Sequence, residues 1–293
     1  MKRLVVTADD FGAAPEVNEA VERAYREGAL TAASLMVAGA AAADAVARAK
    51  AMPGLRVGLH LVLVGERPAL PSSAIPDLVD GRGRLRADMA RAGAAMAFRP
   101  RVRRQLEAEI RAQFEAFRAT GLVLDHVNAH KHFHLHPTIC SLMISVGREF
   151  GMRAARAPCE PRLPQEAAAP RTRMESAIAR PFALALRRRL RAKGILVPDA
   201  VFGLAWSGAM TAPRLRAILK ALPEGLSEIY MHPATGPYEG SAPGYRYAEE
   251  LMALTDPSVL ELVNGAEARR GGFADFAPSP SKARLALPSG AAL

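Results

Sequence analysis

The sequence predicts an α/β fold built on parallel strands, and two observations lead to that prediction. Short apolar runs rich in β-branched residues alternate with longer stretches in which apolar residues recur at helical spacing. Such alternation is typical of parallel strands joined by right-handed crossovers. Polar side chains also follow the ends of the apolar runs: Asp9, Asp10, His60, Asn128, His130, Arg156 and His232. Because barrel enzymes build their sites from the carboxyl ends of several strands, we favour a (β/α) barrel-like arrangement over an open doubly wound sheet.

The strands and helices can be assigned in chain order. The runs expected as strands cover residues 3–8, 31–37, 55–63, 122–129, 152–158 and 226–233. The stretches expected as helices cover residues 15–28, 41–54, 103–121, 138–151 and 212–225. In the helix at 103–121, one face carries Leu106, Ile110, Phe114 and Phe117.

Two irregular stretches and a tail interrupt this alternation. We expect one domain over residues 1–275, with inserts at 64–102 and 159–205. A last short strand is expected from Gly271, and a disordered tail over 276–293. Within the second insert, residues 176–194 combine apolar side chains (Ile178, Phe182, Leu186, Leu190) with basic ones (Arg187, Arg188, Arg189, Arg191, Lys193). This stretch fits either a solvated outer helix or a contact with an anionic membrane surface.

Composition narrows the class of protein. The chain of 293 residues has a formal net charge of +10, which would suit nucleic acid, anionic lipid or acidic substrates. Nucleic acid is disfavoured, because we find no nucleic-acid motif and no basic segment interleaved with aromatic residues. No apolar run reaches the roughly 20 residues of a membrane-spanning helix, and the first residues do not resemble a signal peptide, so we expect a cytoplasmic protein. Two cysteines predict no disulfide framework.

Histidine is concentrated in three short stretches. Five of the seven histidines lie in "HVNAHKHFHLHP" (126–137), and the others are His60 and His232. The residues before the cluster favour a strand and Pro137 fits the start of a helix, so we expect a strand end that runs into a loop. Imidazole is the commonest protein ligand of transition metals, and two histidines with one carboxylate leave positions open for water and substrate. The pattern therefore predicts a catalytic metal centre.

An acidic pair can supply the carboxylate. The motif "TADDFG" places Asp9 and Asp10 directly after the first strand. Neighbours on an extended chain point to opposite sides, so one of them can bind metal while the other accepts a proton. The alternative is a helix N-cap with an acidic first turn, because a helix follows soon after. A single histidine in an apolar strand, such as His60, can likewise be a core residue.

Four motifs together resemble a known family. In this order and spacing, "TADDFG", "GLHL", "HVNAHKHFHLHP" and "EIYMHP" are similar to those of the YdjC-like carbohydrate deacetylases, the family of the chitooligosaccharide deacetylase. The resemblance extends from residue 1 to about residue 275. Thr7 departs from the asparagine more usual in the first motif. That form, with "APEVNEAVERA" and "TAASLMVAGAAAADAVA", most resembles the hopanoid biosynthesis-associated HpnK subgroup.

The resemblance implies a modified TIM-barrel-like fold with one bound divalent metal. Mg²⁺ is the ion that the family implies, and the ligand chemistry also suits Zn²⁺. Carried over by position, the metal ligands are Asp10, His60 and His130, and the general base is Asp9.

The same comparison places further residues in the site. His232 stands where a general acid is expected, and Arg156 resembles a site arginine that holds Asp9 or the substrate. His132 and His134 belong to the motif as substrate contacts or as groups behind the ligands. The roles of His126 and His136 stay open.

The implied activity is metal-dependent hydrolysis of an N-acetyl group on an amino sugar. In the HpnK subgroup the implied substrate is N-acetylglucosaminyl hopanoid, which yields glucosaminyl hopanoid. The alternatives are a deacetylase of chitooligosaccharides or another acetylated sugar, a metal-dependent phosphoesterase, and a basic lipid-binding protein. The partners expected are an acetylated sugar, a glycolipid included, and the inner membrane surface through residues 176–194, without nucleic acid. An oligomer is compatible with the sequence.

Overall fold

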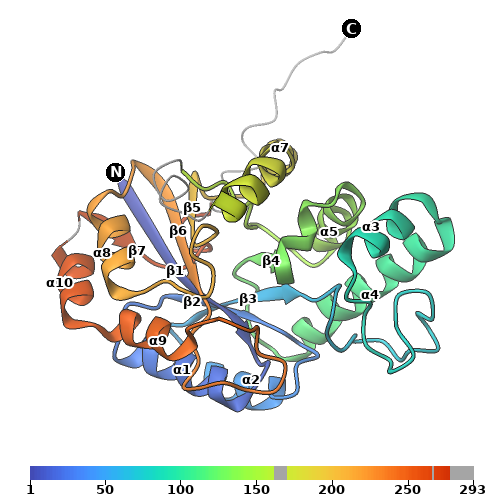
Figure 1. Cartoon of the computed structure of the whole chain (residues 1–293), viewed down its shortest axis with the longest axis horizontal. Helices are drawn as coiled ribbons and strands as arrows, with labels where there is room; N and C mark the ends of the chain where they lie inside the picture. Colours follow the sequence, from blue (N-terminus) through green and yellow to red (C-terminus); the bar gives the residue numbers. More distant parts are fainter. Residues whose placement is uncertain (162–169, 266, 278–293) are drawn as a thin grey trace, which may run out of the picture.

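The computed structural model describes residues 1–161, 170–265 and 267–277. Its strands form one sheet in the order β4-β3-β2-β1-β6-β5, with β7 paired to β1, and every pairing is parallel. The strands are β1 (Lys2–Phe11), β2 (Ala32–Leu35), β3 (Arg56–Leu61), β4 (Val127–Ala129), β5 (Ala200–Phe202), β6 (Gly225–Met231) and β7 (Ala268–Arg270). The sheet curls into a half-barrel with flanking helices (Figure 1), which confirms the predicted TIM-barrel-like α/β fold.

Helices surround this sheet. They are α1 (Pro15–Arg26), α2 (Ala42–Lys50), α3 (Met89–Phe98), α4 (Pro100–Ala119), α5 (Pro137–Glu149), α7 (Pro170–Ala192), α8 (Ala212–Lys220), α9 (Tyr247–Thr255) and α10 (Pro257–Gly265), with a 3-10 helix η1 (His130–Leu135). In Figure 1, α8 and α10 lie on the left of the strands, α3, α4 and α5 on the right, α1 and α2 below, and α7 above. The predicted apolar face of α4 is buried along its whole length.

The segment 152–158 is not the regular strand that the sequence predicts. Ala155 forms an isolated bridge with Val127 of β4, and Ala154 forms one with Leu196. Farther along, the amide of Val201 in β5 donates to the carbonyl of Cys159. The segment therefore connects the two edges of the curled sheet through isolated bridges rather than a continuous ladder. Two prolines in or beside it, at positions 158 and 161, lack the amide hydrogen that a longer ladder requires.

The end of the described chain also differs from expectation. The last strand, β7, lies before Gly271 and pairs with the first residues of β1. The following turn, 271–277, packs at the amino-terminal ends of the strands, where the amides of Phe273 and Ala274 donate to Asp125. The first two residues of the predicted disordered tail, Phe276 and Ala277, belong to this turn, and Phe276 is half-buried. The rest of that tail, 278–293, lies outside the described residues.

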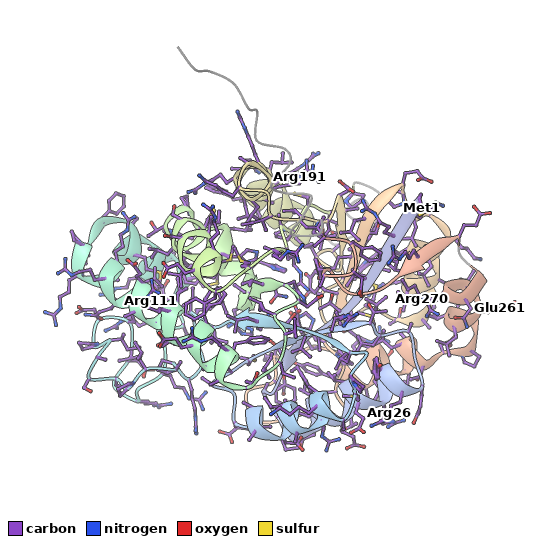
Figure 2. The ribbon with its side chains drawn as sticks, turned by 180° about the vertical axis from the view of Figure 1, so that it is seen from behind. Met1, Arg26, Arg111, Arg191, Glu261 and Arg270 are labelled. Atoms are coloured by element: carbon purple, nitrogen blue, oxygen red, sulfur yellow. The ribbon has the colours of Figure 1, made fainter. Side chains whose placement is uncertain are left out.

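The positive charge is spread over the surface. Four labelled arginines, Arg26, Arg111, Arg191 and Arg270, project from separate parts of the molecule (Figure 2). Three of them pair with a carboxylate: Arg26 with Glu22, Arg111 with Glu149, and Arg191 with Asp199. Within the described part of the chain, no helix is both long enough and apolar enough to cross a membrane.

Candidate active site

A pocket of about 1480 Å³ opens at the carboxyl ends of the strands. Six of the predicted site residues line it: Asp9, Asp10, His60, His130, His132 and His232. The other two, Arg156 and His134, are fully buried behind this lining. The structure thus gathers residues that are up to 223 positions apart, as expected if strand ends supply the site.

A bulge in β1 turns both acidic residues toward the site. The register of β1 against β2 is Ala8 with Ala33 and then Phe11 with Leu35, so one more residue lies on β1 than on β2. Asp10 takes the left-handed backbone conformation, with φ of 62°, which side-chain-bearing residues seldom adopt. Bulges re-aim side chains beside active sites. Because of this bulge, neighbouring aspartates reach different partners at the same end of the sheet.

Asp10, His60 and His130 form a cluster that can hold a metal ion. Asp10 Oδ1 lies 3.2 Å from His60 Nε2 and 3.1 Å from His130 Nδ1, and one ligand atom from each residue lies within 4.8 Å of the others. Ligand atoms bound about 2.0–2.2 Å from one ion are separated by similar distances. Burial would raise the pKa of Asp10, but His130 and His60 lower it well below its ordinary value. Asp10 is therefore a carboxylate, the form that binds metal.

The hydrogen bonds of His60 leave one ring nitrogen available. Its Nδ1 lies 2.7 Å from the side-chain oxygen of Asn128, so Nδ1 carries the proton and donates it. The Asn128 amide nitrogen donates to Asp9 and to Ser34, which settles the orientation of this side chain. His60 Nε2 is buried and has no hydrogen-bond partner among the described residues. A buried lone pair aimed at Asp10 fits a metal ligand whose second nitrogen is held from behind.

Asp9 belongs to a buried ion cluster with Arg156. The guanidinium of Arg156 contacts both carboxylate oxygens of Asp9, at 2.5 and 3.0 Å, and also binds Glu228 of β6. Burial alone would raise the pKa of Asp9, but Arg156 and then His60 lower it far below its ordinary value. The same contacts outweigh burial and raise the pKa of Arg156. Asp9 is therefore an anion held in one position beside the cluster of Asp10, His60 and His130.

His132 and His134 have different surroundings although both belong to η1. His132 lies on the pocket lining with its Nε2 3.0 Å from the hydroxyl of Tyr230. His134 donates from Nε2 to the backbone carbonyl of Arg156 at 3.0 Å. Burial lowers the pKa of His132 far below its ordinary value, and it lowers the pKa of His134 to about 3. Both rings are therefore neutral near pH 7. Through its hydrogen bond to the Arg156 carbonyl, His134 supports the segment that carries this arginine.

His232 lies opposite this group at the end of β6. Its ring packs at right angles to Tyr230 and at a steep angle to Tyr245, with centroids 5.7 and 5.2 Å apart. Its backbone amide donates to the buried carboxylate of Glu250 on α9, which fixes the strand end. The ring itself is half-buried and faces the pocket.

The model of the family described as YdjC-like protein matches residues 3–265. The chain belongs to this YdjC-like family. It is 40% identical over 148 residues to a protein of Brevibacillus brevis named carbohydrate deacetylase, a match that spans 50% of this chain and only 56% of that relative. It is 32% identical over 288 residues to the human protein of the same name, covering 88% of this chain and 85% of that one.

A solved structure confirms the fold of this YdjC-like chain. It belongs to an Enterococcus faecalis V583 protein described as a candidate for cellobiose-phosphate cleavage. The TM-score is 0.74 at 21% sequence identity, with 94% of this chain and 99% of that chain covered. At this identity the likeness concerns the fold alone.

Several residues of this YdjC-like site are not among those that the sequence predicts. Glu228 is the second partner of Arg156 and follows Ser227 in an otherwise apolar strand. A charged residue in an apolar strand is the sequence feature that could have identified it. Four of the five tyrosines also line the pocket: Tyr230, Tyr238, Tyr245 and Tyr247. Three of these lie in or next to the long connection after β6, where no regular spacing announces them.

The two remaining histidines of the motif lie away from the metal cluster. His126 is fully buried and contacts Asp125 and Ser34. His136 precedes α5, where it is half-buried and burial lowers its pKa. The motif therefore supplies one candidate metal ligand, His130, and several supporting residues.

Proposed function

We propose that this protein is a metal-dependent carbohydrate deacetylase that removes the N-acetyl group of an amino sugar. One observation carries the proposal: Asp10, His60 and His130 converge beside Asp9 and His232 on the wall of one large pocket. Membership of the YdjC-like family and relatives named carbohydrate deacetylase support this reaction over others.

The three ligands provide the electrophilic part of the site. A divalent ion held by Asp10, His60 and His130 would polarise the acetamide carbonyl and make a water acidic enough to react near neutral pH. Two histidines with one carboxylate suit Zn²⁺ as well as the Mg²⁺ that the family resemblance implies. Asn128 holds His60 in the tautomer that this requires.

Asp9 is the base that takes the proton of the attacking water. Arg156 and Asn128 fix both of its oxygens, so little reorganisation precedes the reaction. Arg156 keeps the pKa of Asp9 low, so Asp9 is ionised and able to accept a proton near neutral pH.

His232 donates a proton to the leaving amine. It faces the pocket from β6, whereas Asp9 lies on the neighbouring β1, so the two groups can act from different sides of a bound acetamide. A positioned acid or base of this kind typically contributes about 10² to 10⁴-fold in rate. The products are acetate and the free amino sugar.

The tyrosines form the part of the pocket that receives the sugar. Tyr238, Tyr245 and Tyr247 contact one another with ring centroids 5.3 and 5.5 Å apart. Tyr245 also contacts the ring of His232, so the aromatic surface begins next to the proposed acid. Aromatic rings with one polar end pack against the C–H face of a sugar and donate to its hydroxyls.

The substrate carries an apolar group beside the sugar, as N-acetylglucosaminyl hopanoid does. Ile178 and Phe182 of α7 line the same pocket although their residues are 64% and 47% exposed. Apolar side chains that remain this exposed at a pocket mouth favour an apolar ligand. The other half of the predicted apolar face, Leu186 and Leu190, is buried against the barrel instead.

The outer surface of α7 is the proposed contact with an anionic membrane. Only part of its basic stretch is available for this. Arg187 and Arg191 bind Asp199, and Arg189 binds Ser141. Arg188 and Lys193 are exposed. A membrane contact through α7 would therefore rest on these two cations and the exposed Arg180, together with the apolar residues of the pocket lining.

Acetate release tests the proposed reaction. The protein, loaded separately with Zn²⁺ and Mg²⁺, is incubated with N-acetylglucosaminyl hopanoid or with N,N′-diacetylchitobiose, and Asp9→Asn serves as the inactive control. Acetate from the lipid alone supports both the reaction and the hopanoid substrate. Acetate from the chitobiose supports the reaction and removes the hopanoid specificity. Metal-loaded protein that releases acetate from neither, but phosphate from phosphoesters, would contradict the deacetylase.

A further inference from the structure

A line of buried hydrogen bonds runs from the amino-terminal ends of the strands to the candidate metal site. Asp125 Oδ2 lies 2.8 Å from His126 Nδ1, and His126 Nε2 lies 2.9 Å from Ser34 Oγ. Ser34 Oγ in turn accepts from the Asn128 amide at 2.9 Å. All four residues are at most 3% exposed. The line ends on Asn128, the residue that holds both His60 and Asp9.

The direction of every hydrogen bond in this line follows from its two ends. Asp125 accepts the amides of Phe273 and Ala274, so its carboxylate also accepts from His126 Nδ1. A ring protonated on Nδ1 presents a lone pair at Nε2, which accepts the Ser34 hydroxyl proton. The Ser34 oxygen is then free to accept from Asn128.

The opposite orientation of Asn128 would be unfavourable at two places. Its side-chain oxygen would face the carboxylate of Asp9 and the oxygen of Ser34. Each mismatch leaves a buried polar group without its partner, at a cost of about 1–3 kcal/mol. The line from Asp125 therefore favours one orientation of Asn128 and, with it, one tautomer of His60.

We propose that Asp125, His126 and Ser34 are positioning residues for the metal site. Through Asn128 they keep the proton of His60 on Nδ1, so that Nε2 can bind a metal ion, and they orient Asp9. This inference rests on the metal site of the proposed function, but it assigns a role to His126, a histidine of the motif that is not part of the pocket lining.

Two packing features show that the fold accommodates this line specifically. A Cβ atom on Gly58 would lie 2.5 Å from the His126 ring, so the glycine of "GLHL" leaves the space that this ring fills. On its other side the ring stacks on Phe273, with centroids 4.3 Å apart. The turn 271–277 thus fixes the starting point of the line by ring packing and by two amides.

The test removes one hydroxyl from the line and compares it with a matched hydroxyl outside it. Ser34→Ala breaks the line and leaves the metal ligands in place. Ser227→Ala is the control, because Ser227 is equally buried in the sheet and its hydroxyl has no hydrogen-bond partner among the described residues. The dissociation constant for Zn²⁺ is measured by calorimetry, and the proton positions on His60 and His126 by ¹⁵N NMR of the metal-free protein. Thermal melting confirms that both variants fold.

We expect Ser34→Ala to weaken Zn²⁺ binding by about 10-fold, the lower end of the effect of residues behind a ligand, and Ser227→Ala to leave it unchanged. In the wild type, His60 and His126 carry their protons on Nδ1, and in Ser34→Ala His60 becomes a mixture of tautomers. A wild-type His60 that carries its only ring proton on Nε2, or a Ser34→Ala protein that binds Zn²⁺ like the wild type, would overturn the inference.

These readouts separate the inference from the proposed function. If the tautomers and the Zn²⁺ affinities change as expected but no acetylated sugar is hydrolysed, the positioning role is supported and the proposed deacetylase activity is contradicted. If acetate is released but Ser34→Ala changes neither measurement, the deacetylase stands and the positioning role falls. The NMR measurement decides on the tautomers even in a protein that binds no Zn²⁺.

Discussion

The two sides of the pocket are built in different ways. The inner side consists of strand ends, where Asp9, Asp10 and His60 are buried and held by hydrogen bonds and ion pairs from several strands. The outer side consists of α7 and the connection after β6, where Ile178 and Phe182 remain exposed. The inner side has a geometry fixed before any ligand arrives, as catalysis requires. The outer side does not hold these three residues, so it is the side where we propose that the rest of the substrate is recognised.

The largest loss of activity on the inner side is expected when a candidate metal ligand is removed. We expect His60→Ala and Asp10→Ala to lose Zn²⁺ and Mg²⁺ binding and all detectable acetate release, because two remaining ligands hold an ion weakly. Calorimetry and acetate assays measure the two effects. His136→Ala, a motif histidine outside the cluster, is the control and should bind metal normally. Full activity of His60→Ala without bound metal would remove the metal from the mechanism.

Removal of the proposed base should lower the activity without lowering the metal affinity. Asp9→Asn keeps a similar shape but replaces one accepting oxygen with an amide and removes the negative charge, and we expect kcat to fall by about 10² to 10⁴-fold while the metal affinity changes little. Glu228→Gln is the matched control, because Glu228 binds the same arginine but is not part of the pocket lining. It should lose much less activity. Equal losses in the two variants would indicate that Arg156, rather than Asp9, governs the rate.

The inner side is also the part that the sequence predicted best. Its residues follow strand ends, and strand ends of a parallel sheet meet at one edge, so the acidic pair, His60 and the histidine cluster could be expected to lie together, whereas the choice of Asp10, His60 and His130 as ligands came from the family resemblance. The bulge that turns Asp10 could not be foreseen, because it depends on the register of β1 against β2. Likewise the roles of His126 and Ser34 depend on which side chains meet across the sheet, and local spacing says nothing about such pairs.

Elsewhere the sequence pattern failed where tertiary contacts replace regular structure. The segment 152–158 reads as a strand, yet it is held by single bridges on both sides. The basic and apolar stretch of α7 reads as one amphipathic face, but its two ends have different neighbours. Leu186 and Leu190 pack on the barrel, whereas Ile178 and Phe182 line the pocket. A periodic pattern identifies the face of a helix and leaves open what covers it.

The outer side can be tested by changing its apolar surface. We expect Ile178→Ser with Phe182→Ser to raise KM for N-acetylglucosaminyl hopanoid by about 10-fold, because the loss of apolar contact of this size is worth about 1.5 kcal/mol. KM for N,N′-diacetylchitobiose and kcat for both substrates should stay unchanged. Phe98→Ser, which alters an exposed phenylalanine outside the pocket lining, is the control. An equal increase of KM for both substrates would show that α7 supports the pocket without selecting an apolar group.

The proposed membrane contact of α7 can be tested separately from the pocket. Arg180, Arg188 and Lys193 are exposed, whereas Arg187, Arg189 and Arg191 bind Asp199 or Ser141, so three cations of residues 176–194 are available to lipid. At about 1 kcal/mol for each cation near an anionic surface, Arg188→Glu with Lys193→Glu should reduce flotation with anionic vesicles by about 10-fold or more and leave neutral vesicles unaffected. Arg26→Glu, on a separate part of the surface, is the control (Figure 2). If both variants float like the wild type, α7 does not bind the membrane, and its exposed apolar residues serve the pocket alone.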